Sequence, residues 1–409
     1  MIYYIIHIFS ICMLLWFGFR KRSVHLDAKL FWLGLMVRVF GGLSFAVIYL
    51  LWIKEGDTIA FFYKATDLAD LALNFPNKYF DFLISSQHDL YKSEGRDGFF
   101  IKILSVFALA TNNNYWLTTV YFSILSFFPI WYLINVIYLK FPNHKWSLIA
   151  AFLILPSPIF WTSGILKDCL VFTSLALIMT GLFKIHFDQK LKWYDVVGLI
   201  ISLILLFKLR YFLFGLTSAG LIAITMNRFI FSKIDRLIST MAIWVLIIII
   251  CVSGISLINP NLYPSNFPKA LYDNYVTILN HSEAGNTLEF NLQPHWWSLI
   301  VHVPESLFSG LYRPFLGEAS SYHLIHGLEN LGLIILSIFS MIYLKKSPHP
   351  NALFLIGLLF ILILATFFPL ASPNFGSLMR YKAIYLPLLF YFVSIVPLSI
   401  WFPIDDIKG

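Results

Sequence analysis

LISTMAIWVLIIIICVSGISLI, residues 237–258, is the stretch of sequence that decides the class of fold. It has no charged side chain after Arg236, and it is as long as the roughly 20 apolar residues that cross a hydrocarbon core. The whole chain of 409 residues is 59% hydrophobic and 12% charged. Because a soluble domain carries roughly 25% charged residues, this chain has too little polar surface to cover itself in water. We therefore expect a membrane protein.

Similar apolar segments lie on both sides of this stretch. We predict an all-α, polytopic membrane protein with about 11 transmembrane helices. The predicted spans are residues 3–19, 31–53, 116–139, 146–163, 169–184, 194–208, 211–227, 237–258, 327–344, 352–369 and 384–402. Neither a repeat nor a flexible linker interrupts them, so we expect a single transmembrane domain over residues 1–409. The first segment has no basic leader and no small-residue cleavage site, so it is expected to stay in the membrane.

Short basic connections alternate with the predicted spans. They contain Arg20-Lys21-Arg22 with Lys29, Lys140 with Lys145, Lys184 to Lys192, Arg228 to Arg236, and Lys345-Lys346. Because basic loops favour the cytoplasmic side, placing all of them inside puts the N-terminus outside and Gly409 in the cytoplasm. The net charge of +8 is explained by these loops, which argues against nucleic-acid binding.

Two long connections are expected on the outer face, at residues 54–115 and 259–326. In the first, Ile59 to Leu73 is predicted to form an amphipathic helix with Ile59, Phe62, Tyr63 and Thr66 on one face. Phe99 to Ala110 is apolar apart from Lys102 but, at 12 residues, too short to cross a membrane. Both segments are expected to lie as helices at the interface between membrane and water.

Asp57 is the first candidate for chemistry, because it directly follows the second predicted span. A carboxylate just outside the bilayer can take a proton from an incoming hydroxyl group. Tyr63, a turn and a half later, is a candidate for contact with the substrate. The alternative is structural, since Asp before an amphipathic helix is a favoured N-cap.

Two further candidate groups lie where spans are joined on the predicted outer side. A Pro-rich turn, Pro156 to Asp168, places Lys167 and Asp168 at the outer surface. The structural alternative is that Asp168 caps the following helix while Lys167 reaches along the membrane surface. Lys208 and Arg210 lie outside against the positive-inside trend, which favours either a bound phosphate or a carboxylate from a loop as their partner.

The second half of the chain adds polar residues around its last spans. Arg380, Tyr381 and Lys382 precede the final span and are expected outside. The second long loop contributes His302, Glu305, Arg313, His323 and His326. These histidines lack any recognised metal-binding spacing, so no metal site is predicted. Arg38 lies inside the second span, where we expect a structural ion pair.

The sequence contains no DxD pair, P-loop, GxSxG or GxGxxG motif. This argues against a nucleotide-sugar transferase, an ATPase and a serine hydrolase.

The order of the remaining features resembles the GT-C superfamily of membrane glycosyltransferases. That superfamily includes protein O-mannosyltransferase-like and aminoarabinose-transferase-like branches. In this chain an acidic residue follows an early span, interfacial helices come next, and a Pro-rich turn with a second acid precedes a basic turn. The resemblance covers residues 30–230, the module that the superfamily shares. The chain departs from the pattern at Thr58, where relatives keep a second acid, and in its additional span at 3–19.

The resemblance implies a role for each candidate residue. Asp57 falls at the position of the catalytic carboxylate, and Asp168 falls at the second acidic position. Lys208 lies near the position of a phosphate-contacting Lys. Arg380-Tyr381 resembles an Arg-Tyr pair that precedes a late span in many relatives.

The resemblance thus implies an inverting glycosyltransferase in the cell (inner) membrane. Its donor is expected to be a polyprenyl-phosphate-linked sugar, and its acceptor a glycan, lipid or protein at the outer face. Asp57 is expected to act as general base, while Lys208, Arg210 and Arg380 hold the phosphate. Lys167 and Asp168 are expected to position the acceptor or the sugar. No cofactor is predicted, and a divalent metal ion stays an open alternative.

Two other functions remain open. The first is a lipid-linked polysaccharide polymerase or ligase, for which Arg313 and Arg380 suit a diphosphate leaving group. The second is a transporter or flippase for a sugar-lipid. A transporter predicts charged residues deep in several spans, whereas here they gather mainly in loops.

Overall fold

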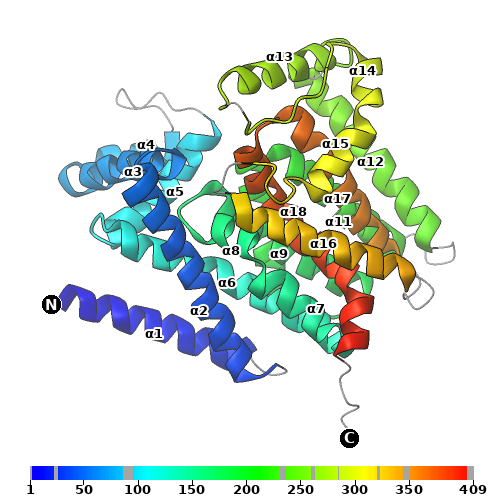
Figure 1. Cartoon of the computed structure of the whole chain (residues 1–409). Coiled ribbons are helices and arrows are strands. Elements are labelled where there is room, and N and C mark those ends of the chain that lie inside the picture. Colours follow the sequence, from blue (N-terminus) through cyan, green and yellow to red (C-terminus); the bar gives the residue numbers. More distant parts are fainter. Residues whose placement is uncertain are drawn as a thin grey trace, which may run out of the picture. The chain divides into compact units, whose positions relative to one another are not determined.

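The chain is almost entirely helical in the computed structural model (Figure 1). The structure describes residues 2–22, 26–85, 95–229, 236–258, 263–283, 285–319, 323–343 and 351–402. The β-type pairing among these residues is one isolated bridge between Thr287 and Asn374. The predicted all-α class is therefore confirmed for the described chain. The predicted basic pair Lys345-Lys346 and the terminal Gly409 lie outside the described residues.

The described chain divides into two compact units. The first comprises residues 1–154, 159–180 and 194–210, and the second comprises residues 155–158, 181–193 and 211–409. Elements of the first are α1 (Ile2–Arg22), α2 (Ala28–Val47), η1 (Ile48–Ile53), α3 (Asp57–Asn74), α4 (Pro76–Ser85), α5 (Arg96–Ala110), α6 (Tyr115–Lys140), η2 (Pro142–His144), α7 (Lys145–Ile149), η3 (Ala150–Ile154) and α10 (Trp193–Leu209). Helices α8 (Pro156–Ser163) and α9 (Lys167–His186) contribute residues to both units. The second unit holds α11 (Tyr211–Phe229), α12 (Arg236–Ile258), α13 (Phe267–Asn280), α14 (Trp296–Val301), α15 (Val303–Tyr312), α16 (Leu324–Ile342), α17 (Ala352–Ala371) and α18 (Phe375–Trp401).

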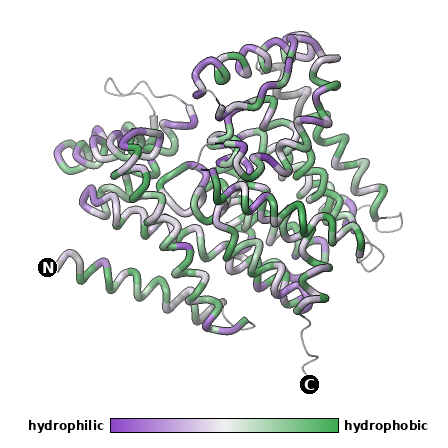
Figure 2. Tube along the Cα trace, in the orientation of Figure 1, coloured by the Kyte–Doolittle hydropathy of each residue, from purple (hydrophilic) through white to green (hydrophobic). Residues whose placement is uncertain are grey.

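Seven helices among the described residues are long and apolar enough to cross a membrane, and a bent pair makes eight if it forms one span. They are Ala28–Ile53, Tyr115–Lys140, Lys167–His186, Tyr211–Phe229, Leu324–Ile342, Ala352–Ala371 and Phe375–Trp401, with the bent pair Pro142–Ile154 and Pro156–Ser163. Hydrophobic residues recur along α2 and α12 (Figure 2). These helices are those of a multi-pass membrane protein.

The predicted number of 11 spans is not confirmed. The predicted segments 3–19, 194–208 and 237–258 are helical, as α1, α10 and α12. Apolar helical stretches are described at Ile5–Trp16 in α1 and at Leu237–Ile250 in α12. Helix α10 has only 17 residues.

The core of the first unit forms where α2 packs closely against α6. Phe31 of α2 is fully buried, and its ring lies 5.1 Å from that of Phe127 and 5.4 Å from that of Trp131, both on α6. Glycine permits the close approach of α2 to its other neighbours. A Cβ atom on Gly42 would lie 2.9 Å from the carbonyl oxygen of Ser163 and 2.2 Å from Ser123 Oγ.

The two predicted interfacial helices are present as α3 and α5. They pack against each other, with the rings of Phe61 and Phe100 5.4 Å apart. The buried residues of α3 are Thr58, Phe61, Phe62, Ala65, Leu68 and Ala69. Of the predicted face only Phe62 is buried, and Tyr63 is 65% exposed. The packing of α5 against α3, which periodicity alone does not contain, selects the buried face.

The second unit has a close helix crossing of its own. Helices α15 and α17 pack together at Gly310, where an added Cβ atom would lie 2.0 Å from the carbonyl oxygen of Ala365. Tyr385 of α18 donates a hydrogen bond of 2.7 Å to the carbonyl oxygen of Gly310. The same glycine therefore joins α15 to both α17 and α18.

We expect Gly310→Ala to destabilise the protein by about 1–3 kcal/mol, because the backbone of α17 must move to admit a methyl group. Gly332→Ala in α16 is the matched control, since nothing lies within 4 Å of an added Cβ there. That change removes a helix-interior glycine and should leave stability equal or slightly higher. Thermal unfolding of both variants in detergent measures the difference, and equal midpoints would contradict the close crossing.

Candidate functional site

Two adjacent residues of opposite charge begin α9. Asp168 is fully buried and accepts a hydrogen bond of 2.8 Å from the Nη2 atom of Arg210, whose side chain is 11% exposed. Arg210 lies between α10 and α11, so this ion pair joins the start of α9 to the end of α10. Of the two partners predicted for Arg210, a carboxylate and a phosphate, the structure supplies the carboxylate.

Lys167 forms the second ion pair of this region. Its Nζ atom lies 2.5 Å from Oδ1 of Asp97, in the first turn of α5, and 4.8 Å from the ring centre of Phe61. The Asp97 side chain is 58% exposed, so this pair meets water while the Asp168 pair does not. Neighbouring residues of α9 thus hold two different helices.

Lys102 of α5 and Lys208 of α10 add two positive charges to the helices that these ion pairs hold. Lys208 is exposed near the end of α10, and Lys102 lies on α5, where it donates a hydrogen bond of 3.2 Å to the carbonyl oxygen of Leu83. Burial lowers the pKa of Lys102, and the charge of Lys208 lowers it further. Lys102 was not predicted as a functional residue, because its neighbour is more than a hundred residues away along the chain.

These residues form a closed chain of neighbours, which we call the charged ring: Asp97, Lys102, Lys167, Asp168, Lys208 and Arg210. Ion pairs link Asp97 to Lys167 and Asp168 to Arg210, and electrostatic repulsion links Lys102 to Lys208. The remaining links are between residues that lie within five positions of each other in the sequence. With four cations and two carboxylates, the ring carries an excess of positive charge. Such an arrangement favours an anion with several oxygen atoms, such as a phosphate.

Asp57 lies in the exposed first turn of α3. It is not the N-cap, because Gly56 precedes the helix at φ 116°. Asp57 and Phe61 are one turn apart and therefore share a face of α3. Lys167 contacts that face through the ring of Phe61, which links Asp57 to the charged ring.

Thr58, which stands where the GT-C pattern has a second acid, has a structural role. Thr58 is fully buried, and its hydroxyl group lies 2.6 Å from that of Tyr115 at the start of α6. Tyr63 is exposed on another side of α3, so the structure gives no support to its predicted contact with the substrate.

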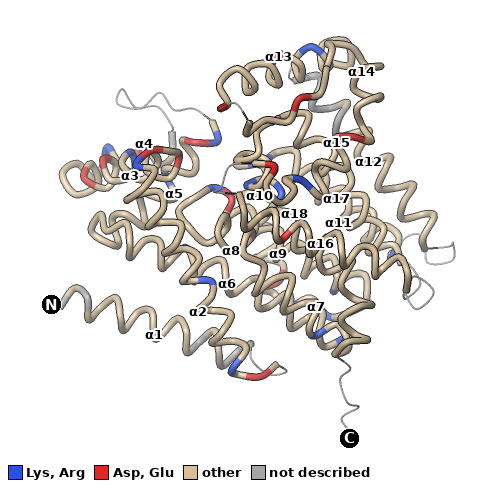
Figure 3. Tube along the Cα trace, in the orientation of Figure 1, with Lys and Arg blue, Asp and Glu red and all other residues tan. Residues whose placement is uncertain are grey.

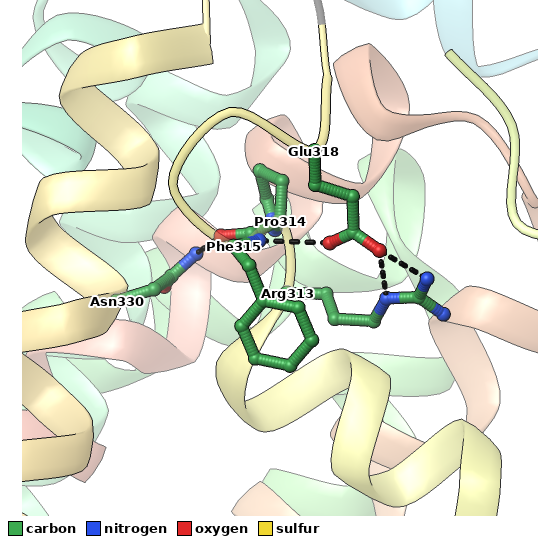
Figure 4. A network of polar contacts seen from close by, with 5 residues as sticks. All are labelled: Arg313, Pro314, Phe315, Glu318 and Asn330. Carbon is green, nitrogen blue, oxygen red and sulfur yellow. Dashed lines mark hydrogen bonds and ion pairs between the residues drawn. The ribbon is translucent and has the colours of Figure 1, made fainter. Parts of the chain in front are cut away.

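The predicted residues of the second unit do not form such a ring. Arg313 is held by Glu318, which accepts hydrogen bonds from its Nε atom at 2.6 Å and from Nη2 and also binds the backbone N–H of Phe315 (Figure 4). Asn330 donates to the carbonyl oxygen of Pro314 at 2.8 Å, which ties the same loop to α16. Tyr381 stacks on Phe368 with 4.9 Å between ring centres, and Arg380 is half-buried.

Lys382, which was predicted to precede the final span on the outer side, lies within α18 and is 1% exposed. Its Nζ atom donates 2.6 Å hydrogen bonds to the carbonyl oxygen of Leu311 and to Oδ1 of Asn330. Leu311 lies in the last turn of α15, where backbone carbonyl groups have no partner within that helix. Lys382 of α18 therefore supplies the missing hydrogen-bond donor.

Charged residues are otherwise sparse along the apolar helices, as the uncharged lengths of α6 and α17 show (Figure 3). Within the part of the chain that the structure describes, no group of three His, Cys, Asp or Glu side chains is arranged to hold a metal ion. Burial lowers the pKa of His323, which keeps that side chain neutral near pH 7.

The chain matches no known family model, no curated protein and no solved structure. The resemblance to the GT-C superfamily therefore stays a prediction.

We expect the two ion pairs of the charged ring to contribute very differently to stability. Asp168→Asn leaves Arg210 as a buried charge without its carboxylate and should cost about 3–5 kcal/mol. Asp97→Asn makes the same chemical change in the exposed pair and should cost at most about 1 kcal/mol. Thermal unfolding in detergent compares the two, and equal losses would show that burial does not distinguish the pairs.

Proposed function

We propose that the protein is an inverting glycosyltransferase that moves a sugar from a polyprenyl-phosphate donor to a glycan, lipid or protein acceptor. The observation that carries the proposal is the charged ring beside the face of α3 that holds Asp57. Its excess of positive charge suits the phosphate of a lipid donor, and the apolar helices around it suit the polyprenyl tail. The resemblance of residues 30–230 to the GT-C module supports the same function.

In the proposed reaction, the acceptor oxygen attacks the anomeric carbon of the sugar while the bond from that carbon to the phosphate oxygen breaks. Asp57 takes the proton from the acceptor hydroxyl, and the polyprenyl phosphate leaves with the electron pair of the broken bond. Lys208, Arg210 and Lys102 stabilise the negative charge on the leaving phosphate. Attack from the face opposite the leaving group inverts the configuration at the anomeric carbon.

Asp168 takes a different role from the one that the resemblance implies. A fully buried carboxylate paired with Arg210 has no oxygen facing solvent to offer to an acceptor. We assign it to positioning, because it fixes the guanidinium group that faces the phosphate. Lys167 remains a candidate for contact with the donor, since it lies against Phe61, one turn from Asp57.

The membrane topology is part of this proposal. The alternation of basic loops supports about 11 spans, an extracytoplasmic N-terminus and a cytoplasmic C-terminus in the cell membrane. In that arrangement the starts of α3, α5 and α9 lie on the outer side, where lipid-linked sugars are used.

A polymerase or ligase that uses a diphosphate-linked oligosaccharide is the second candidate. The electrostatic interaction between Lys102 and Lys208 favours it, because two lysines that act on each other match the additional charge of a diphosphate. Assays with donors that differ only in the number of phosphates distinguish the two candidates.

We expect Asp57→Asn to lower turnover with a polyprenyl-phosphate sugar by about 100-fold to 10,000-fold, because the amide cannot accept the proton of the acceptor hydroxyl. Asp67→Asn is the matched control, since Asp67 is an exposed carboxylate of the same helix. The rate of sugar transfer in nanodiscs, measured with a radiolabelled donor, checks the prediction. Equal turnover of a well-folded Asp57→Asn protein and of the control would remove the base assignment.

A further inference from the structure

Arg38 is a buried cation that the proposed reaction does not use. It lies in the middle of α2 with 2% of its surface exposed. The ion pair expected from the sequence is wrong: among the described residues, no carboxylate pairs with it. A charge at this depth is expensive and calls for a physical explanation.

Every hydrogen-bond partner of Arg38 is neutral, and most of them belong to one turn. Its Nη2 atom donates to the carbonyl oxygen of Thr162 at 2.7 Å and to Oγ1 of Thr162 at 2.6 Å. Its Nε atom donates to Ser126 Oγ at 3.0 Å, and the ring of Phe172 lies 5.5 Å from the guanidinium carbon. The guanidinium group therefore joins α2 to α6, α8 and α9.

Thr162 belongs to the last turn of α8, where backbone carbonyl groups have no partner within the helix. These carbonyls form the negative end of the helix dipole, so Arg38 places its charge where the dipole favours a cation. Ser123 of α6 donates a 3.0 Å hydrogen bond to the next carbonyl, that of Ser163. Two elements thus bind the end of α8 from different sides.

The turn between α8 and α9 is also held by close packing. An added Cβ atom on Gly164 would lie 2.4 Å from the ring of Phe45, so this turn lies directly against α2. Lys167 and Asp168 follow within four residues of Gly164 and enter the charged ring. The position of the end of α8 consequently determines the position of both charged side chains.

We propose that Arg38 is a positioning residue that fixes the last turn of α8 and thereby places Lys167 and Asp168 in the charged ring. Its effect on turnover rests on the proposed function, whereas its effect on the turn does not. A role in stability alone explains Arg38 poorly. A cation within a span is costly to bury, its partners here are all neutral, and Nη1 of Arg38 has no hydrogen-bond partner among the described residues.

The experiment compares three variants of the full-length protein in nanodiscs: Arg38→Met, Arg38→Lys and Asn135→Leu. Asn135 is the matched control, because it is a buried polar residue of α6 that donates to the carbonyl oxygen of Trp131 in its own helix. Hydrogen–deuterium exchange of peptides covering residues 159–170 reports the turn. Steady-state kinetics with the lipid donor report kcat and KM separately.

For Arg38→Met we expect exchange over residues 163–168 to become about 10-fold faster, because the charge-assisted bonds to Thr162 are lost. We expect kcat to fall by up to about 100-fold with little change in KM, since a displaced group loses rate rather than binding. Arg38→Lys keeps the cation without the forked geometry and should restore part of both. Asn135→Leu should change neither.

Unchanged exchange over residues 163–168 in Arg38→Met would overturn the proposal. Faster exchange with unchanged kcat would leave Arg38 a structural residue and overturn its link to the charged ring. If Arg38→Met does not fold, equal exchange and equal kcat in Arg38→Lys and the unmodified protein would overturn it. If the unmodified protein transfers no sugar, the proposed function fails, and the exchange measurement still decides whether Arg38 fixes the turn.

Discussion

The buried ion pair between Asp168 and Arg210 is the interaction on which the candidate site depends. Arg210 follows α10 and Asp168 begins α9, so the pair fixes the ends of two helices that periodicity alone leaves unrelated. A carboxylate removed from water at this depth is tolerated only with a charged partner in good geometry. Because Lys167 is the neighbour of Asp168, fixing one fixes the other, and through Asp97 the first turn of α5 is held as well.

Two other buried cations follow a different rule, which recurs in both units. Arg38 binds the carbonyl oxygen of Thr162 at the end of α8, and Lys382 binds that of Leu311 at the end of α15. Among the described residues, neither forms an ion pair with a carboxylate. Carbonyl groups at helix C-termini and neutral side chains bind them, and Glu329 adds an electrostatic interaction with Lys382. In each case the helix end leads directly into a turn with further polar residues, at 164–168 and 313–318. In each unit a buried cation thus binds the carbonyl end of a helix.

The sequence was sufficient to predict the all-α membrane class, most of the spans, and the helices α3 and α5, because length and apolar periodicity determine these features locally. It was insufficient wherever a distant segment decides the outcome. Packing against α5 selects Phe61 rather than Tyr63 as a buried residue of α3. Arg38 was expected to pair with a carboxylate because sequence reasoning counts charged residues, whereas helix C-terminal carbonyls carry no sequence signature. Lys102 was overlooked because its relation to Lys208 exists only in the folded chain.

In the first unit, carboxylates neutralise some of the buried and half-buried cations but not all of them, and this affects which ligands the charged ring attracts. Asp168 balances Arg210 and Asp97 balances Lys167, and the charged ring still holds more cations than carboxylates. In surroundings of low dielectric constant, a positive potential of this kind extends further than it does in water. An anionic lipid headgroup that approaches from the membrane surface is attracted by it, while a neutral acceptor is not. An excess of positive charge of this kind costs free energy when no anion balances it, and this is the physical reason why the charged ring suits the phosphate of the donor in the proposed reaction.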